Sequence, residues 1–183
     1  MTDAPSWTLF AGEQRLAAGA PAEVAAAAHA AIQADHEGPV LAFDDATGRV
    51  VDLDLRGSAA EVAARYTPVA EAPRPRGRPK LGVTAREVTL LPRHWEWLAA
   101  QPGGASVTLR KLVEQARRAD DGASARKGRQ EAAYRFMASM AGDLPGYEEA
   151  LRALFAEDQA GFEAQIARWP SDVADHARRL AWA

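Results

Sequence analysis

Apolar and polar residues along residues 1–67 follow two periods, which together predict a small β-α-β-β-α unit. In residues 49–55 apolar residues occupy every second position and alternate with aspartates, the pattern of a half-buried strand. In the alanine-rich stretch after Pro21 the larger apolar residues recur at helical spacing, and proline is favoured in the first turn of a helix. The predicted strands are residues 6–11, 40–43 and 49–55, and the predicted helices are residues 21–35 and 58–66, the second opened by a Ser58–Glu61 capping box.

Helical spacing dominates the rest of the chain after a proline-rich stretch at residues 68–79. A helix at residues 92–101 places Trp95 and Leu98 on one face, where we expect a core. A turn at residues 102–106 leads to the next helix, with Ser106 as its N-cap. The further predicted helices are residues 107–118, 131–141, 147–156, 159–169 and a last one from Ser171, with a Gly- and Ser-containing linker at residues 120–130.

Composition excludes several classes of site. The chain has no cysteine, which rules out disulfides, iron–sulfur clusters and cysteine-based zinc sites. It contains no run of about 18 apolar residues, so we expect no membrane span. Asp3 stands where a secretory signal would carry a basic residue, so we expect a cytoplasmic protein.

Acidic residues and histidines raise the question of a metal or catalytic site. Asp52 and Asp54 belong to an acidic group in residues 44–54, but they occupy the polar positions of the alternating strand, so we interpret the group as the solvent face of a hairpin. His29 and His36 have no third ligand at metal-binding spacing. No catalytic residue, metal ligand, cofactor or small-molecule substrate is indicated, and we expect that the protein is not an enzyme.

Charge is distributed unevenly along the chain. The net charge is −3, which alone argues against binding nucleic acid. Residues 74–118, however, hold ten Lys or Arg and three Glu, a local charge of +7. Residues 1–73 carry −7 and residues 119–183 carry −3. A polyanion would therefore be attracted to the middle of the chain and repelled by both ends.

The stretch that opens this basic band resembles an AT-hook, a motif that binds the minor groove of A·T-rich DNA. Gly77 lets the backbone lie on the floor of a narrow groove, and Arg76 and Arg78 extend along it toward base acceptors. The prolines keep the segment extended, and the outer basic residues would contact phosphates. A solvated basic linker is the alternative. The predicted DNA-contacting residues are Arg74, Pro75, Arg76, Gly77, Arg78, Pro79 and Lys80.

The segment from residue 84 to residue 119 resembles the ribbon-helix-helix family of bacterial DNA-binding proteins. Residues 86–91 would form the ribbon, which in that family pairs with the same strand of a second chain and enters the major groove. Two departures are that Glu87 would face the DNA and that Arg86 would fall on the buried side. The alternative is a strand and helical hairpin that only pack in a core. The predicted DNA-contacting residues here are Arg86, Thr89, Gly104, Ser106, Arg110 and Lys111.

As a whole, the chain resembles a bacterial family known only as a domain of unknown function. The stretches that carry this resemblance are residues 77–83, 86–118 and 134–170. The family has no assigned activity, so the resemblance implies none. We predict an α+β fold with a β-α-β-β-α domain at 1–67, a Pro/Arg-rich linker at 68–83, a ribbon-helix-helix-like segment at 84–119, a second linker at 120–130 and a helical domain at 131–183.

These patterns favour a DNA-binding function. We expect a transcriptional regulator or nucleoid-associated factor that prefers A·T-rich duplex and acts as a homodimer, because two weak modules on one chain gain from effective concentration and dimerisation doubles every contact. The alternative is a protein-interaction adaptor whose basic segment binds an acidic partner.

Overall fold

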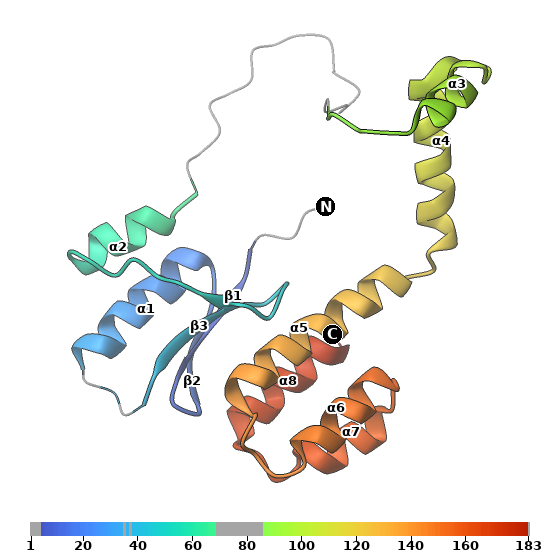
Figure 1. Cartoon of the computed structure of the whole chain (residues 1–183). Helices are drawn as coiled ribbons and strands as arrows, with labels where there is room; N and C mark the ends of the chain where they lie inside the picture. The colour runs from blue at the N-terminus through green and yellow to red at the C-terminus, as the bar shows by residue number, and fades with distance from the viewer. Residues whose placement is uncertain (1–4, 35, 37, 69–85, 183) are drawn as a thin grey trace. The chain divides into compact units, whose positions relative to one another are not determined.

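The structure is a computed structural model that describes residues 5–34, 36, 38–68 and 86–182 (Figure 1). The chain forms two compact units. Unit 1 combines residues 1–68 with residues 124–183, and unit 2 is the intervening stretch, residues 69–123. The fold is mixed α+β, as predicted: a four-stranded antiparallel sheet lies near the N-terminus, and the C-terminal part of the described chain is mostly helical.

The sheet of unit 1 has the strand order β2-β1-β3-β4. Its strands are β1 (Trp7–Ala11), β2 (Gln14–Gly19), β3 (Val40–Asp44) and β4 (Val50–Val51). Strand β2 was not predicted, because its sequence lacks the β-branched and aromatic residues typical of strands. It forms because Gly12, at φ 54°, allows a tight turn that pairs Ala11 with Gln14. The predicted strand at 49–55 is shorter in the structure, where only its first apolar residues pair with β3.

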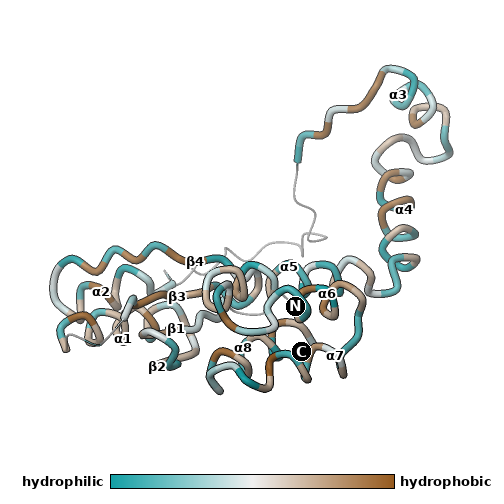
Figure 2. Tube along the Cα trace, turned by 60° about the horizontal axis from the view of Figure 1, so that its bottom comes forward, coloured by the Kyte–Doolittle hydropathy of each residue, from teal (hydrophilic) through white to brown (hydrophobic). Residues whose placement is uncertain are grey.

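Both faces of the sheet are buried, and alternate residues of β1 and β3 serve the two faces. Leu9 and Ala42 pack with Val24 and Ala28 of helix α1 (Pro21–Gln33). Helix α2 (Ala59–Tyr66) adjoins α1 and begins with the predicted capping box, in which Ser58 and Glu61 bond reciprocally. Helices cover both faces of the sheet at β3, so both sides of this strand are buried and it is hydrophobic along most of its length (Figure 2).

The opposite face of the sheet packs on the C-terminal helices. The ring centroids of Phe10 and Phe43 lie 5.4 Å and 4.9 Å from that of Phe136, and these rings belong to one core cluster with His176 beside them. The helices that supply the rest of this core are α5 (Ala123–Met140), α6 (Tyr147–Phe155), α7 (Gln159–Ile166) and α8 (Ser171–Trp182).

Two predicted domain boundaries therefore differ from the structure. Residues 131–183 do not form a domain separate from residues 1–67, because the aromatic residues of β1 and β3 need the C-terminal helices to cover them. Residues 120–130 were predicted to be a linker, but α5 begins at Ala123. Alanine, arginine, lysine and glutamine in this stretch favour a helix strongly enough to accommodate Gly128.

A polar network joins the start of the sheet to α8. Asp45 accepts hydrogen bonds from the hydroxyls of Ser6 and Thr8, each at 2.8 Å. Arg179 donates through Nη2 to Thr8 Oγ1 and to Nδ1 of His176, each at 2.9 Å, and the same nitrogen lies 3.2 Å from Asp45. The sequence analysis did not single out His176, which is completely buried here.

In the described part of the chain, no helix combines the length and the hydrophobicity that crossing a membrane requires.

Candidate nucleic-acid interface

The predicted minor-groove segment, Arg74–Lys80, lies outside the described residues, so its seven predicted contacts stay predictions. The rest of the predicted interface lies in the described part of unit 2. It consists of the segment at residues 86–91 and the helices α3 (Pro92–Ala99) and α4 (Gly104–Ala119).

The two helices were predicted, and the structure moves the start of the second. Gly103 is the N-cap of α4 at φ 88°, and Gly104 follows at φ 71°. Glycine is the residue that adopts this left-handed region without strain, which explains the paired glycines at the reversal. Ser106 therefore lies inside the first turn of α4 and is not the N-cap that the sequence predicted. No side chain caps this helix end.

The ribbon prediction is not tested by a single chain. Residues 86–91 pair as a strand with none of the residues that the structure describes, and a ribbon of this kind would pair with a second copy. Arg86 is exposed and not on a buried side, contrary to the position that the alternation suggested, and Thr89 is exposed as well. Glu87 is also exposed, so it would be available to interact with any ligand of this segment.

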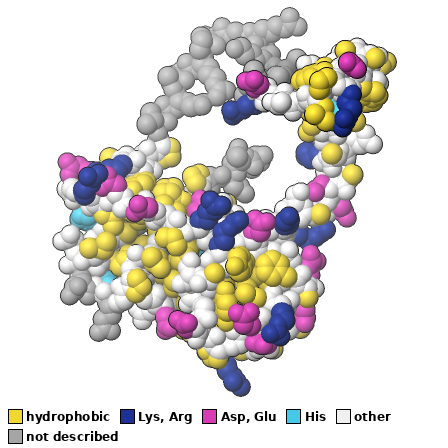
Figure 3. All heavy atoms as spheres, in the orientation of Figure 1, with side chains coloured by type: hydrophobic (Ala, Val, Ile, Leu, Met, Phe, Trp, Pro, Cys, Tyr) yellow, Lys and Arg dark blue, Asp and Glu magenta, His cyan; other side chains and the backbone are white. Residues whose placement is uncertain are grey.

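The hairpin has almost no core of its own. Leu98 is buried, as predicted, but Trp95 is 40% exposed, so the prediction that Trp95 fills a core is wrong for the single chain. Helix α4 buries no residue at all, and Leu112 and Val113 are 43% and 64% exposed. Hydrophobic side chains gather on the surface around α3 (Figure 3). The described part of this unit therefore leaves several large apolar side chains exposed to water.

Two of the exposed apolar residues, Trp97 and Leu112, line a hollow of about 260 Å³. Helical spacing places Leu109, Leu112 and Val113 along one side of α4. The six residues that line the hollow come from the extended segment and from both helices: Leu90, His94, Trp97, Leu98, Leu109 and Leu112. The hollow is lined almost entirely by apolar groups, so it is suited to another apolar surface and not to a charged ligand.

The basic residues occupy a different side of α4. Arg110 and Lys111 are exposed, and at 100° per residue they lie away from the apolar stripe. Arg110 donates through Nε to the Ser106 carbonyl at 3.0 Å, which leaves the rest of its guanidinium facing solvent. Neither residue forms an ion pair with any residue that the structure describes.

The last two arginines of α4 are already paired. Arg117 and Arg118 both donate to Glu114, at 3.0–3.1 Å. These hydrogen bonds, first that from Arg117 and then that from Arg118, hold the pKa of the Glu114 carboxyl below its usual value. The cationic surface of this helix is therefore concentrated at Arg110 and Lys111, two of the residues that the sequence had selected.

Family membership follows from the whole chain and not from this unit alone. Residues 6–181 match the model of a family described as "Uncharacterized protein conserved in bacteria (DUF2239)". The chain belongs to the DUF2239 family. The matched residues include both units of this DUF2239 protein, so the helical hairpin is part of the family architecture. The predicted resemblance to a bacterial family of unknown function is thereby confirmed. No curated protein and no solved structure matches the chain.

The described residues of this DUF2239 chain contain no group of three histidine, aspartate or glutamate side chains that could hold a metal ion. The group at residues 44–54 serves structure instead: Asp45 joins the network with α8, and Asp54 binds Arg56 at 2.7–2.8 Å. The basic residues Arg126 and Arg129, which the sequence placed in a second linker, belong to the first turns of α5.

Proposed function

We propose that this DUF2239 protein binds A·T-rich DNA as a homodimer. The observation that carries the proposal is the sequence Arg76-Gly77-Arg78-Pro79 inside a band with a local charge of +7, in a chain whose two ends are acidic. Two guanidinium groups beside a glycine suit a narrow minor groove, where the negative potential attracts inserted arginines. The acidic ends would be repelled by the duplex, which confines contact to the middle of the chain.

The charge distribution of the hairpin supports a second set of DNA contacts. Arg110 and Lys111 present cationic groups that are free of carboxylate partners among the described residues, and such groups bind phosphates. Because Arg117 and Arg118 are held by Glu114, we expect them to contribute less. Phosphate contacts of this kind add affinity and orientation without sequence preference, so the A·T preference is expected to come from Arg76 and Arg78.

The apolar side of the hairpin supports a homodimer. Among the described residues of this unit Leu98 is the only buried apolar side chain, and its burial contributes too little to offset the ordering of two helices. A second copy would bring an identical apolar side against this one, as a two-fold interface requires. In the same arrangement residues 86–91 of the two copies could pair as a ribbon.

The proposal is tested by titrating the full-length protein into A·T-rich and G·C-rich duplexes and measuring fluorescence anisotropy. The wild type is expected to prefer the A·T-rich duplex, with an affinity that falls by about one log unit per contacted phosphate for each log unit of salt. A variant with Arg76→Ala and Arg78→Ala is expected to lose the preference. Its matched control is Arg56→Ala with Arg152→Ala, which removes two exposed arginines outside the basic band.

The control is expected to bind as the wild type does. If Arg76→Ala with Arg78→Ala binds A·T-rich duplex as tightly as the wild type, the minor-groove assignment is wrong. If no duplex is bound even in dilute buffer, DNA binding itself is refuted.

One observation favours a second candidate, a protein-interaction adaptor: the hollow on the hairpin is apolar and suits a protein surface. An adaptor would use its basic segment to bind an acidic partner. A competition experiment distinguishes the two functions. A·T-rich duplex should displace a bound acidic protein only if Arg76 and Arg78 bind both the DNA and that protein.

A further inference from the structure

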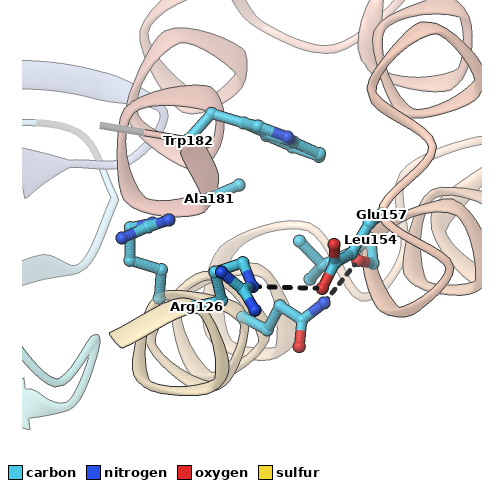
Figure 4. A pocket seen from close by; sticks show the side chains of 7 residues that line it. Arg126, Leu154, Glu157, Ala181 and Trp182 are labelled. Carbon is cyan, nitrogen blue, oxygen red and sulfur yellow. Dashed lines mark hydrogen bonds and ion pairs between the residues drawn. The ribbon is translucent and has the colours of Figure 1, made fainter. Parts of the chain in front are cut away.

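A second concave site lies in unit 1, far along the sequence from the predicted DNA contacts. It is a cavity of about 170 Å³ between the first turns of α5, the end of α6 and the last turn of α8. In Figure 4, Arg126 extends toward Glu157, while Ala181 and Trp182 stand on the opposite side of the cavity. Three segments that are distant in the sequence therefore line this cavity: α5 supplies the cationic side, α6 supplies the apolar floor at Leu154, and α8 supplies the aromatic ring.

The cationic side of the cavity consists of Arg126 and Arg129. The Arg126–Glu157 pair is long, at 3.9 Å, and both side chains are substantially exposed, so that pair is weak. Nε of Arg129 is buried and has no hydrogen-bond partner among the described residues. Folded proteins rarely leave a charged donor buried and unsatisfied, because desolvation is then not compensated. A ligand with an acceptor at this position would satisfy it.

Other polar groups around the cavity are already engaged. Gln130 donates through Nε2 to the carbonyl of Leu154 at 3.1 Å, which joins α5 to α6 and fixes the floor. Glu157 would repel an anion, but it lies on the Arg126 side, where its charge is opposed by that guanidinium. The site therefore lacks a hydrogen-bond acceptor for Nε of Arg129.

We propose that this cavity binds a small organic acid that carries one carboxylate on a flat apolar body. The carboxylate would accept from Arg129 and Arg126, and guanidinium groups bind carboxylates with directional, charge-assisted hydrogen bonds. The flat body would contact the ring of Trp182 and the side chain of Leu154. The volume admits roughly one ring with its substituent, since a cavity of about 150 Å³ holds benzene. It is too small for a nucleotide or a drug-sized ligand, which need about 300 Å³ or more.

The site is tested by isothermal titration calorimetry of the full-length protein with benzoate as the probe. Benzamide serves as the neutral probe of the same shape, and inorganic phosphate as the anion without a ring. We expect benzoate to bind with a Kd of about 0.1–1 mM, which is reasonable for so few atoms, and benzamide and phosphate to bind at least ten-fold more weakly.

Two variants assign the binding to this cavity. Arg129→Met keeps the apolar stem and removes the unsatisfied donor, and Arg126→Gln removes the charge of a half-exposed side chain. Each is expected to weaken benzoate binding about ten-fold or more, as the loss of a charged hydrogen bond does. Arg152→Gln on α6, an exposed arginine that does not line the cavity, is the control and should bind as the wild type. The melting temperature of Arg129→Met should equal or exceed that of the wild type.

Several results would overturn the proposal. Benzoate that fails to saturate the protein at about 10 mM, or that binds no better than benzamide, refutes a carboxylate site. Phosphate binding as tight as benzoate refutes the role of the ring. Unchanged benzoate affinity in both arginine variants shows that the site is elsewhere, and a lower melting temperature for Arg129→Met shows that Arg129 is a structural residue. None of these outcomes depends on DNA binding.

Discussion

The substitution Gly48→Ala tests whether the two ends of the chain fold into one unit. Gly48 lies in the loop between β3 and β4 at φ 65°, and a Cβ added there would come within 1.9 Å of the Ala132 carbonyl oxygen on α5. The carbonyl carbon and Cα of Ala132 would be 2.6 Å and 2.8 Å away. All three are backbone atoms of a helix, so no change of side-chain rotamer can relieve the clash. The loop and the helix must move apart instead.

The expected cost has two parts. A side chain in the left-handed region costs roughly 1–2 kcal/mol, and overpacking at a rigid contact typically adds about 1–3 kcal/mol. Separation would also stretch the hydrogen bond from Arg135 Nη1 to the Thr47 carbonyl, which is 3.0 Å long. We therefore expect Gly48→Ala to lower the free energy of unfolding by about 2–5 kcal/mol, a large fraction of the stability of an ordinary domain.

The measurement is urea denaturation followed by circular dichroism, with Gly146→Ala as the matched control. Gly146 also has a positive φ, 78°, but its Cβ would meet first the side-chain amide of Gln165 at 2.9 Å, which can rotate away. The control should therefore show only the backbone cost of roughly 1–2 kcal/mol. Equal destabilisation by the two variants would mean that α5 does not lie against the loop, and the single-unit fold would be refuted.

Two further predictions concern the buried histidine and the hairpin. Burial, and then the charges of Arg179 and Arg15, lower the pKa of His176 to about 3. As the pH falls, the histidine of the unfolded chain is therefore protonated before that of the folded chain, and the stability present above pH 6.5 is lost progressively toward pH 3. We expect the free energy of unfolding to fall by about 2 kcal/mol between pH 7.5 and 5. Urea titrations at those two values should show a smaller loss for His176→Gln, and an identical loss would contradict the assignment. Leu112→Glu with Val113→Glu should convert the proposed dimer to monomer in sedimentation equilibrium while unit 1 keeps its circular dichroism signal; a variant that stays dimeric would exclude this apolar side as the interface.

The elements of the fold were largely predictable from sequence, because most of them carry strong local signals. The capping box at Ser58 and the proline that opens α1 fixed two helix starts within a residue or two. Strand β2 carries no such signal, since it depends on a turn at Gly12 and on pairing with β1. Likewise α5 extends through residues that read as a linker, because helix propensity there is supported by packing further along the same helix.

The arrangement of the elements was not predictable from local patterns. Phe10 and Phe43 lie in strands that the sequence assigns to a small N-terminal domain, and Phe136 lies in a helix that it assigns to a separate helical domain. Only the contacts between these rings show that they share a core. The role of His176 was hidden for the same reason, because its partners Thr8 and Arg179 come from opposite ends of the chain.

For the candidate site, the structure exposes the predicted cations of α4, and it does not bury the predicted core residue Trp95 in the single chain. Arg110 and Lys111 were chosen because of charge and helix position, and both are exposed without carboxylate partners among the described residues. Trp95 was assigned to a core because aromatic residues at helical spacing usually are buried. Burial, however, depends on the partner surface, which local spacing does not specify, and a single copy of this hairpin does not supply it.

The distribution of buried apolar residues links the two proposals for unit 2. Unit 1 covers both faces of its sheet and closes its core with residues from both chain ends, so it can fold on its own contacts. Unit 2 buries one apolar side chain among its described residues, so its helices should gain most of their stability from whatever covers the apolar side. A second copy does this while doubling the number of basic segments presented to one duplex. Dimerisation and DNA binding should therefore be positively coupled: A·T-rich duplex should lower the concentration at which dimers form, and a duplex that leaves the dimer dissociation constant unchanged would separate the two functions.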